Sequence, residues 1–252
     1  MIAPPVYDRI GRTYGRTRRA DPRFAQRIET AVGTGASVVS IGAGTGSYEP
    51  AGTLLAVEPS AAMIAQRPSG AAPAVQATAE AVPLPAGACD VALAVLTIHH
   101  WSDLEAGFAE LRRIAGRQVV LTWDPSYAGA HWLIGEYLPQ LAERNRGRFP
   151  TIERIVDLLG GDVLVEEMNV PHDCVDGFQG AFWRRPEAYL DPVTRAGISD
   201  FALLADRELE ALDRLAADLE SGAWHRRHAA LLELDELDLG YRLLSTPGSR
   251  KL

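Results

Sequence analysis

A glycine-rich turn is the part of this sequence whose residues and spacing point most clearly to chemistry. Gly42, Gly44 and Gly46 follow an apolar run at alternate positions. Without Cβ atoms the backbone can turn sharply there, and a ligand can lie against the main chain. Glu58 ends the next apolar run, which is where an α/β site hydrogen-bonds the two hydroxyls of a ribose. These residues predict a site for the nucleoside end of a ligand. The structural alternatives are an ordinary strand-to-helix turn for the three glycines and a solvent-exposed carboxylate for Glu58.

The spacing of the glycines distinguishes between kinds of ligand. A dinucleotide site requires G-x-G-x-x-G at the start of a long helix, whose N-terminus then holds the pyrophosphate. Here the spacing is G-x-G-x-G, and Pro50 follows closely enough to cut a helix short. The tighter pattern favours a ligand without phosphate groups.

Three further motifs follow the turn in order, at residues 54–60, 79–85 and 90–101. Together with the glycine turn they resemble the successive motifs of the class I S-adenosylmethionine-dependent methyltransferases, in particular the small-molecule group that is similar to methyltransferase type 11. The resemblance covers roughly residues 7–125. It implies S-adenosyl-L-methionine as the cofactor. It also implies an α/β, Rossmann-like fold, with a seven-stranded, mostly parallel sheet, helices on both faces and an antiparallel last strand.

The resemblance also implies which residues hold the cofactor. Tyr14 and Arg18 lie where the N-terminal lid of the family reaches the methionine end, and a guanidinium can donate two parallel hydrogen bonds to a carboxylate. The alternative for Arg18 is ordinary surface charge. Thr78 stands where many members have an aspartate for the adenine amino group, and its hydroxyl can still accept that bond. The predicted cofactor-binding residues are Tyr14, Arg18, Gly42, Ala43, Gly44, Gly46, Glu58, Pro59, Met63, Thr78, Ala79, Glu80 and Leu96.

Histidines after the fourth predicted strand are the candidates for catalysis. His99 and His100 come where substrate-facing residues of open α/β sheets collect, and imidazole titrates near neutral pH, so either can be a general base. The alternative is that one histidine packs and the other bonds to the backbone. His131 is a further candidate base, and we expect no metal site.

Aromatic side chains with interleaved arginines mark the second half as the candidate substrate region. Small-molecule pockets are mostly apolar with a few directed polar groups, which this composition can supply. The alternative is that the rings pack the core and the arginines pair with surface acids. The predicted substrate-binding residues are Trp101, Tyr127, Trp132, Phe182, Trp183 and Arg184.

The apolar periodicity predicts the elements that position these residues. Strands are expected at 37–41, 53–57, 73–76, 89–96, 118–122 and 163–170. Helices are expected to begin at Pro22 and at a capping box that starts with Ser102, and to span 131–144, 152–159 and 212–219. Gly222 can cap the last of these helices. We interpret residues 1–252 as one domain. It comprises a cofactor lid (1–20), a cofactor-binding core (21–125), a helical and loop insertion that covers the substrate (126–232) and the final strand (233–246).

Composition excludes several other functions. The net charge is −8 without a long basic run, so a nucleic-acid partner lacks its usual electrostatic footprint. No apolar stretch has the length that a membrane span requires. We therefore expect a cytoplasmic protein, a monomer or homodimer, that acts on a small molecule.

The favoured function is transfer of a methyl group from S-adenosylmethionine to an O, N or C nucleophile of a small molecule, with an aromatic or acidic metabolite as the favoured class. Two alternatives stay open. One is a nicotinamide-dependent oxidoreductase, which the glycine spacing disfavours. The other is a non-catalytic protein that binds S-adenosylmethionine.

Overall fold

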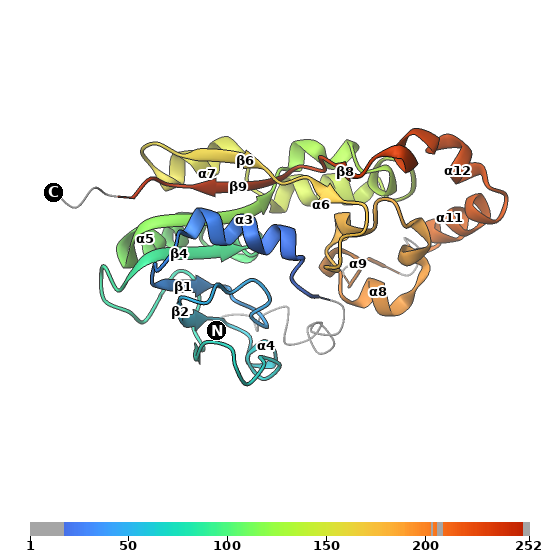
Figure 1. Cartoon of the computed structure of the whole chain (residues 1–252). Helices are drawn as coiled ribbons and strands as arrows, with labels where there is room; N and C mark the ends of the chain where they lie inside the picture. The colour runs from blue at the N-terminus through green and yellow to red at the C-terminus, as the bar shows by residue number, and fades with distance from the viewer. Residues whose placement is uncertain (1–17, 203, 206–208, 249–252) are drawn as a thin grey trace.

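The computed structural model describes residues 18–202, 204–205 and 209–248. Within this part of the chain, seven strands form one sheet in the order β3-β2-β1-β4-β5-β9-β6 (Figure 1). The strands are β1 (Val38–Ile41), β2 (Thr53–Val57), β3 (Ala74–Val75), β4 (Cys89–Val95), β5 (Ala115–Trp123), β6 (Leu164–Glu167) and β9 (Tyr241–Ser245). Tyr14 and most of the predicted lid lie outside the described residues.

The direction of the strands confirms the predicted fold class. β1 pairs in parallel with β2 and β4, and β4 pairs in parallel with β5. β9, the last strand, is antiparallel to both β5 and β6. All four residues of β1 are buried, as expected for an apolar run in a parallel sheet that is covered on both faces.

Three helices cover the two faces of the sheet: α3 (Pro22–Val32), α5 (Leu104–Ile114) and α7 (Ile152–Leu159). Val91 and Leu93 of β4 pack in the same cluster as Phe24 of α3. Ala92 and Ala94 pack in the other cluster, which holds the apolar residues of α5 and α7. Successive side chains of a strand point to opposite faces, so each strand contributes to both layers. Figure 1 shows α3 and α5 on opposite sides of the sheet.

The remaining elements are mostly short. They are α4 (Ala61–Ile64), η2 (Ile98–His100), η3 (Pro125–Gly129), η4 (Leu133–Tyr137), α6 (Gln140–Arg148), β7 (Val170–Pro171), η5 (Gln179–Phe182), η6 (Pro186–Leu190), α8 (Pro192–Ala196), α9 (Ser199–Ala202), α11 (Ala211–Glu220), α12 (Ala223–Arg227), η7 (Ala229–Glu233) and β8 (Glu236–Leu237). Figure 1 shows α8, α9, α11 and α12 gathered beyond one end of the sheet. Among the described helices, each falls short of the length and apolarity that crossing a bilayer requires.

Two predicted helix positions need correction. The helix after β4 is capped by Asp103, which accepts a hydrogen bond from the amide of Ala106 at 2.9 Å, whereas Ser102 donates its hydroxyl hydrogen bond to Glu80. The helix predicted at 131–144 divides into the π-helical turn η4 and the helix α6. The division falls at Pro139, which has no N–H to continue the first element.

The strand predicted at 163–170 is shorter in the structure. β6 ends at Glu167, and Val170 pairs with Leu237 in a separate two-stranded sheet. The predicted cap of the helix at 212–219 is supported, because Gly222 has a left-handed φ of 68° just beyond α11 and its amide bonds to the carbonyl of Leu219 at 3.1 Å.

Candidate functional site

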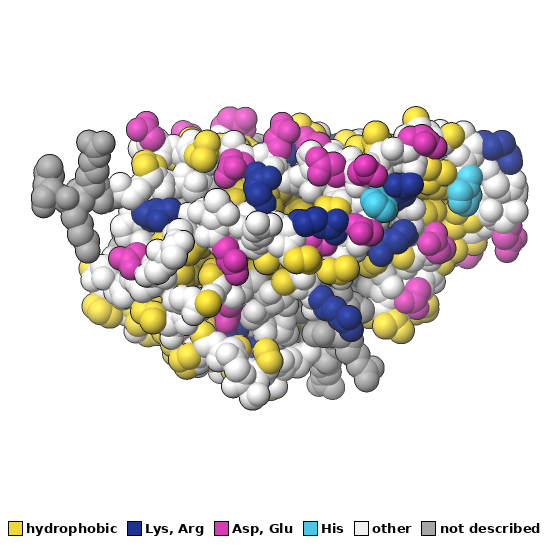
Figure 2. Space-filling view, in the orientation of Figure 1, with side chains coloured by type: hydrophobic (Ala, Val, Ile, Leu, Met, Phe, Trp, Pro, Cys, Tyr) yellow, Lys and Arg dark blue, Asp and Glu magenta, His cyan; other side chains and the backbone are white. Residues whose placement is uncertain are grey.

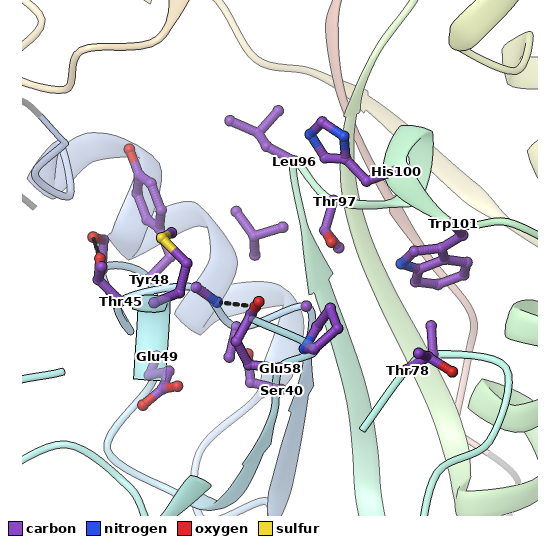
Figure 3. Close-up of a pocket in the computed structure, with 18 of the residues that line it drawn as sticks. Ser40, Thr45, Tyr48, Glu49, Glu58, Thr78, Leu96, Thr97, His100 and Trp101 are labelled. Carbon is purple, nitrogen blue, oxygen red and sulfur yellow. Dashed lines mark hydrogen bonds between the residues drawn. The ribbon is translucent and has the colours of Figure 1, made fainter. Parts of the chain in front are cut away.

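A first cavity of about 230 Å³ lies at the carboxyl ends of β1, β2 and β4 (Figure 3). This is the edge where ligands of open α/β sheets bind. The cavity is lined by Arg18, Ser40, Gly42, Ala43, Gly44, Thr45, Ser47, Tyr48, Glu49, Glu58, Pro59, Met63, Thr78, Ala79, Glu80, Val95, Leu96, Thr97, His100, Trp101 and Ser102. The structure thus brings together all the predicted cofactor residues that it describes except Gly46, which lies between two lining residues.

The glycine turn after β1 adopts the backbone that its sequence predicts. Gly42 and Gly44 have φ values of 63° and 55°, in the left-handed region that other residues rarely enter. A Cβ at Gly42 would overlap the side chain of Thr97, so this glycine also permits close packing against the segment after β4. A Cβ at Gly44 would lie 3.3 Å from Cε of Met63, at the wall of the cavity. The first glycine therefore serves the fold, and the second keeps the cavity open.

Glu58 lies at the centre of the first cavity, between the turn after β1 and the end of β2 (Figure 3). Its Oε2 accepts a hydrogen bond from the amide of Gly44 at 2.8 Å, and its Oε1 accepts one from the amide of Ser60 at 2.9 Å. Only 5% of the residue is exposed. Each carboxylate oxygen has a second lone pair, so Glu58 can hold the two loops and still accept hydrogen bonds from a ligand.

Opposite ends of the first cavity differ in their polar groups. Thr78 and Trp101 lie at one end, and Tyr48 lies at the other (Figure 3). Glu80, near Trp101, accepts from the amide of Ser102 at 2.7 Å. Burial alone would raise the pKa of Glu80, but hydrogen bonds from its own amide and from neighbouring donors outweigh burial and lower it. Its carboxylate therefore holds the segment just before α5.

An ionic network borders the other end of the first cavity. Arg18 donates from Nε and Nη2 to the two oxygens of Asp176, at 2.6 and 3.2 Å. Tyr48 donates its hydroxyl hydrogen bond to Asp176 at 2.9 Å and accepts one from the amide of Asp21 at 3.2 Å. The side chain of Asp176 is fully buried. The network joins the glycine turn, the segment before α3 and the loop before η5.

A second cavity of about 60 Å³ adjoins the first. It is lined by Arg18, Leu96, His99, Trp123, Asn145, Arg148, Phe149, Phe178, Gln179, Ile198, Ser199, Asp200 and Tyr241. Arg18 and Leu96 line both cavities. Leu96 has a φ of 50°, the one positive φ outside glycine among the described residues. Such strained backbone collects at functional sites, where the surrounding structure holds it in place.

The two histidines after β4 face different cavities. His99 lines the second cavity and stacks on Phe149 with ring centroids 4.1 Å apart, and His100 lines the first cavity. Burial and the nearby Arg148 lower the pKa of His100 to about 3. Burial, followed by the charges of His100 and two arginines, lowers the pKa of His99 well below 6.5. Both imidazoles are therefore neutral at physiological pH.

The prediction of His131 as a catalytic base is corrected by its position. The residue is 4% exposed and lines neither cavity, and its Nε2 lies 3.2 Å from the hydroxyl of Tyr189. Burial lowers its pKa to about 3. His131 stacks on Trp132 inside the second half of the chain, so it is a core residue.

Most of the predicted substrate-binding residues also need correction. Trp183 is fully buried, and its indole N–H bonds to the carbonyl of Val170 at 2.9 Å. Trp132 is 5% exposed and donates to the carbonyl of Trp183 at 2.8 Å. Both rings pack in the core, and both indole N–H groups have an acceptor there. Trp101 does line a cavity, but it is the first one.

The other predicted substrate residues likewise lie away from both cavities. Arg184 donates to the carbonyl of Leu234 at 2.9 Å. The guanidinium of Arg242 lies 4.6 Å from the ring centroid of Tyr127. Phe182 packs edge-on against Tyr189. None of these three residues lines either cavity in the described part of the chain.

Sequence reasoning missed the residues that complete the site. Tyr48 follows the glycine turn directly, and its position within the motif is a signal that could have identified it. Asn145 is fully buried on the polar helix α6, four residues after the buried Leu141. A polar residue at this position of the buried helix face is a signal that could have identified it. Asp176 and Asp200 carry no such local signal.

Comparison with known proteins agrees with this geometry. A family model described as a methyltransferase domain matches residues 29–121. A solved structure from Anabaena variabilis, assigned as a methyltransferase from an antibiotic biosynthesis pathway, is 37% identical, with a TM-score of 0.85 over 91% of this chain and 98% of that chain. A SAM-dependent methyltransferase from Thermotoga maritima, named as a possible histamine N-methyltransferase, is 25% identical, with a TM-score of 0.52 over 65% of this chain and 83% of that chain.

Two further comparisons set the limits of this similarity. The cyclase SpnF shares the fold, with a TM-score of 0.53 over 98% of this chain and 96% of that chain, at 16% identity. No curated protein matches the sequence significantly. The likeness to SpnF therefore concerns the fold alone.

Proposed function

Because the chain belongs to the class I S-adenosylmethionine-dependent methyltransferases, we propose that it methylates a small molecule held in the second cavity while the cofactor occupies the first. The observation that carries the proposal is that the two cavities meet at Leu96 and Arg18. Methyl transfer requires donor and acceptor to lie side by side in a fixed orientation. The nicotinamide-dependent alternative is set aside, because the whole-chain relative is a methyltransferase.

The residues of the first cavity fit S-adenosylmethionine. Gly44 leaves backbone exposed at the wall, and Glu58 offers two buried oxygens for ribose hydroxyls. Oε2 of Glu49 accepts a hydrogen bond from Arg67 at 2.7 Å, and its buried Oε1 has no hydrogen-bond partner among the described residues, so it can accept one from a donor such as the amino group of the methionine end. Thr78 and Ala79 would border the adenine, and Arg18 would lie near the carboxylate.

When bound, the cofactor would supply an electrophilic methyl group, which an electron pair of the acceptor would take as the carbon–sulfur bond breaks and its electrons stay on sulfur. The protein's part is to align the acceptor and to accept its proton where one is lost. We assign alignment to the residues of the second cavity. His99 is the proposed hydrogen-bond partner of the acceptor, because it lines that cavity and its Nδ1 is buried without a hydrogen-bond partner among the described residues.

The charge distribution favours a small acceptor over a polyanion. On the face drawn in Figure 2, arginine side chains are interspersed with aspartates and glutamates. The net charge of −8 would repel a phosphate backbone. We therefore propose a small molecule as the partner, and the acceptor's nucleophile can be O, N or C.

The proposal is tested by binding and by turnover. Calorimetry with S-adenosylhomocysteine should detect one site per chain. When the protein is incubated with S-adenosylmethionine and each of a panel of small phenols, acids and amines, at least one compound should be methylated, with formation of S-adenosylhomocysteine. Gly44→Val should abolish both results. Cofactor binding without turnover across the panel would instead favour a non-catalytic binding protein.

A further inference from the structure

Four residues that line the second cavity each carry a buried polar atom without a hydrogen-bond partner among the described residues. Oδ1 of Asn145, Nε of Arg148, Nε2 of Gln179 and Nδ1 of His99 are buried without a hydrogen-bond partner among the described residues. All four residues line this cavity, and Asn145 is fully buried. Buried polar groups normally have hydrogen-bond partners. Four unpartnered groups on residues around one cavity therefore indicate a binding site for a ligand that has polar atoms of its own.

The direction of these hydrogen bonds can be assigned. Nδ2 of Asn145 donates to Oδ2 of Asp200 at 3.3 Å, which leaves the amide oxygen of Asn145 as an acceptor. Nε of Arg148 is a donor in every state of the side chain. A ligand that satisfies both atoms must therefore donate one hydrogen bond to Asn145 and accept another from Arg148.

The charges that line the second cavity are already paired. Arg148 bonds to Asp200, and the side chains are 18% and 5% exposed. Arg18 bonds side-on to both oxygens of Asp176, and the side chains are 12% and 0% exposed. A charged ligand would have to displace a buried partner or remain without one, and either outcome is costly. The second cavity therefore favours a ligand without net charge.

Aromatic rings form much of the remaining wall. Trp123 and Phe149 meet edge to face with centroids 5.1 Å apart, and Phe178 and Tyr241 lie 4.7 Å apart. A cavity of about 60 Å³ has room for about four to six water-sized groups. This space and these walls suit one planar ring with a polar edge.

We infer that the methyl acceptor presents to the second cavity an uncharged aromatic ring that carries a hydrogen-bond donor and acceptor on one edge, as a phenol does. The inference rests on the proposed function, since it names the acceptor class for the same site. It narrows the sequence-based expectation of an aromatic or acidic metabolite, because the two arginines that line the cavity already have aspartate partners.

Three single-ring probes of different charge test the inference. Phenol, benzoate and benzylamine are titrated at neutral pH into the protein saturated with S-adenosylhomocysteine, and binding is followed by NMR. Phenol should bind about tenfold more tightly than either ion, since burying an unpaired charge is costly. Equal or tighter binding of benzoate or benzylamine overturns the inference, and so does the absence of phenol binding.

Variants locate the binding. Asn145→Leu keeps a similar side-chain volume but removes the acceptor, and it should weaken phenol about five- to tenfold. Gln179→Met is a second variant in case the first is unstable. Asn169→Leu is the matched control, since Asn169 also has a buried unpaired Oδ1 but lines neither cavity.

The outcomes separate this inference from the proposed function. S-adenosylhomocysteine affinity should stay within about twofold of the parent in all three variants, because none of these residues lines the first cavity. Failure of the parent to bind S-adenosylhomocysteine would refute the proposed function. Normal cofactor binding with phenol affinity unchanged by both Asn145→Leu and Gln179→Met would refute the inference alone.

Discussion

Replacing Glu58 with glutamine tests the centre of the first cavity with little change in shape. The carboxylate accepts from the amides of Gly44 and Ser60 at 2.8 and 2.9 Å. Glutamine keeps one oxygen and turns the other into an NH₂ group, so one of the two amides loses its acceptor. The charge that would strengthen hydrogen bonds from the ribose hydroxyls is also lost.

The magnitudes follow from these bonds. Hydrogen bonds to charged groups contribute about 1.5–3 kcal/mol and neutral ones about 0.5–1.5 kcal/mol, so the loss in cofactor binding is about 1–3 kcal/mol, or roughly 5- to 150-fold in Kd. One buried amide without an acceptor costs about 1–3 kcal/mol of folding stability. Glu58→Ala would leave both amides without an acceptor, so it should lower stability further.

Calorimetry with S-adenosylhomocysteine and urea denaturation measure the two effects of Glu58→Gln. Glu110→Gln is the control, because Glu110 also accepts a backbone amide bond, from Val82 at 2.8 Å, but lies outside both cavities. The control should lose stability and keep its affinity. An affinity loss below threefold for Glu58→Gln, with the control as expected, would refute the ribose role.

Three further perturbations have defined outcomes. Gly44→Val should raise the Kd of S-adenosylhomocysteine at least about tenfold, whereas Gly35→Val, also at a left-handed φ but with open space around it, should cost stability only. Burial lowers the pKa of His131 from 6.5 to about 3 in the folded protein, so the folded state loses stability as the pH falls below 6.5. At pH 5 this loss is about 2 kcal/mol. In His131→Gln, the difference in unfolding free energy between pH 7 and pH 5, measured with urea, should be smaller by that amount. Asp176→Asn leaves a buried arginine without its anionic partner and should cost about 3 kcal/mol in the same assay. Asp173→Asn, at an exposed pair, should change stability much less.

The cofactor half of the site could be predicted because its signals are local. Gly42 and Gly44 lie within one turn, and Glu58 directly follows the next strand. Since the carboxyl ends of parallel strands meet at one edge of the sheet, a correct strand assignment already brings these residues together. Arg18 was predicted from the family's lid, but its pairing with Asp176, 158 positions away, has no counterpart in the sequence pattern.

The acceptor half could not be predicted because aromatic composition does not distinguish a pocket wall from a core. Trp132 and Trp183 have the residue type of a binding pocket, yet each indole N–H bonds to a buried carbonyl and the rings pack in the core. Whether such a ring is core or pocket wall depends on long-range packing, which the spacing of the residues in the sequence does not specify.

The residues that line the second cavity could not be predicted for the same reason. Asn145 becomes a candidate site residue through Asp200, which lies 55 positions away and accepts one hydrogen bond from its amide nitrogen. That single contact fixes the amide orientation, leaves the oxygen unpaired and turns a residue of an ordinary polar helix into a directed acceptor. Tyr241 reaches the same space from the last strand. The lining of the second cavity is thus assembled from α6, α9 and β9, whereas the lining of the first comes mostly from the turns after β1, β2 and β4, so only the first is marked by local sequence motifs.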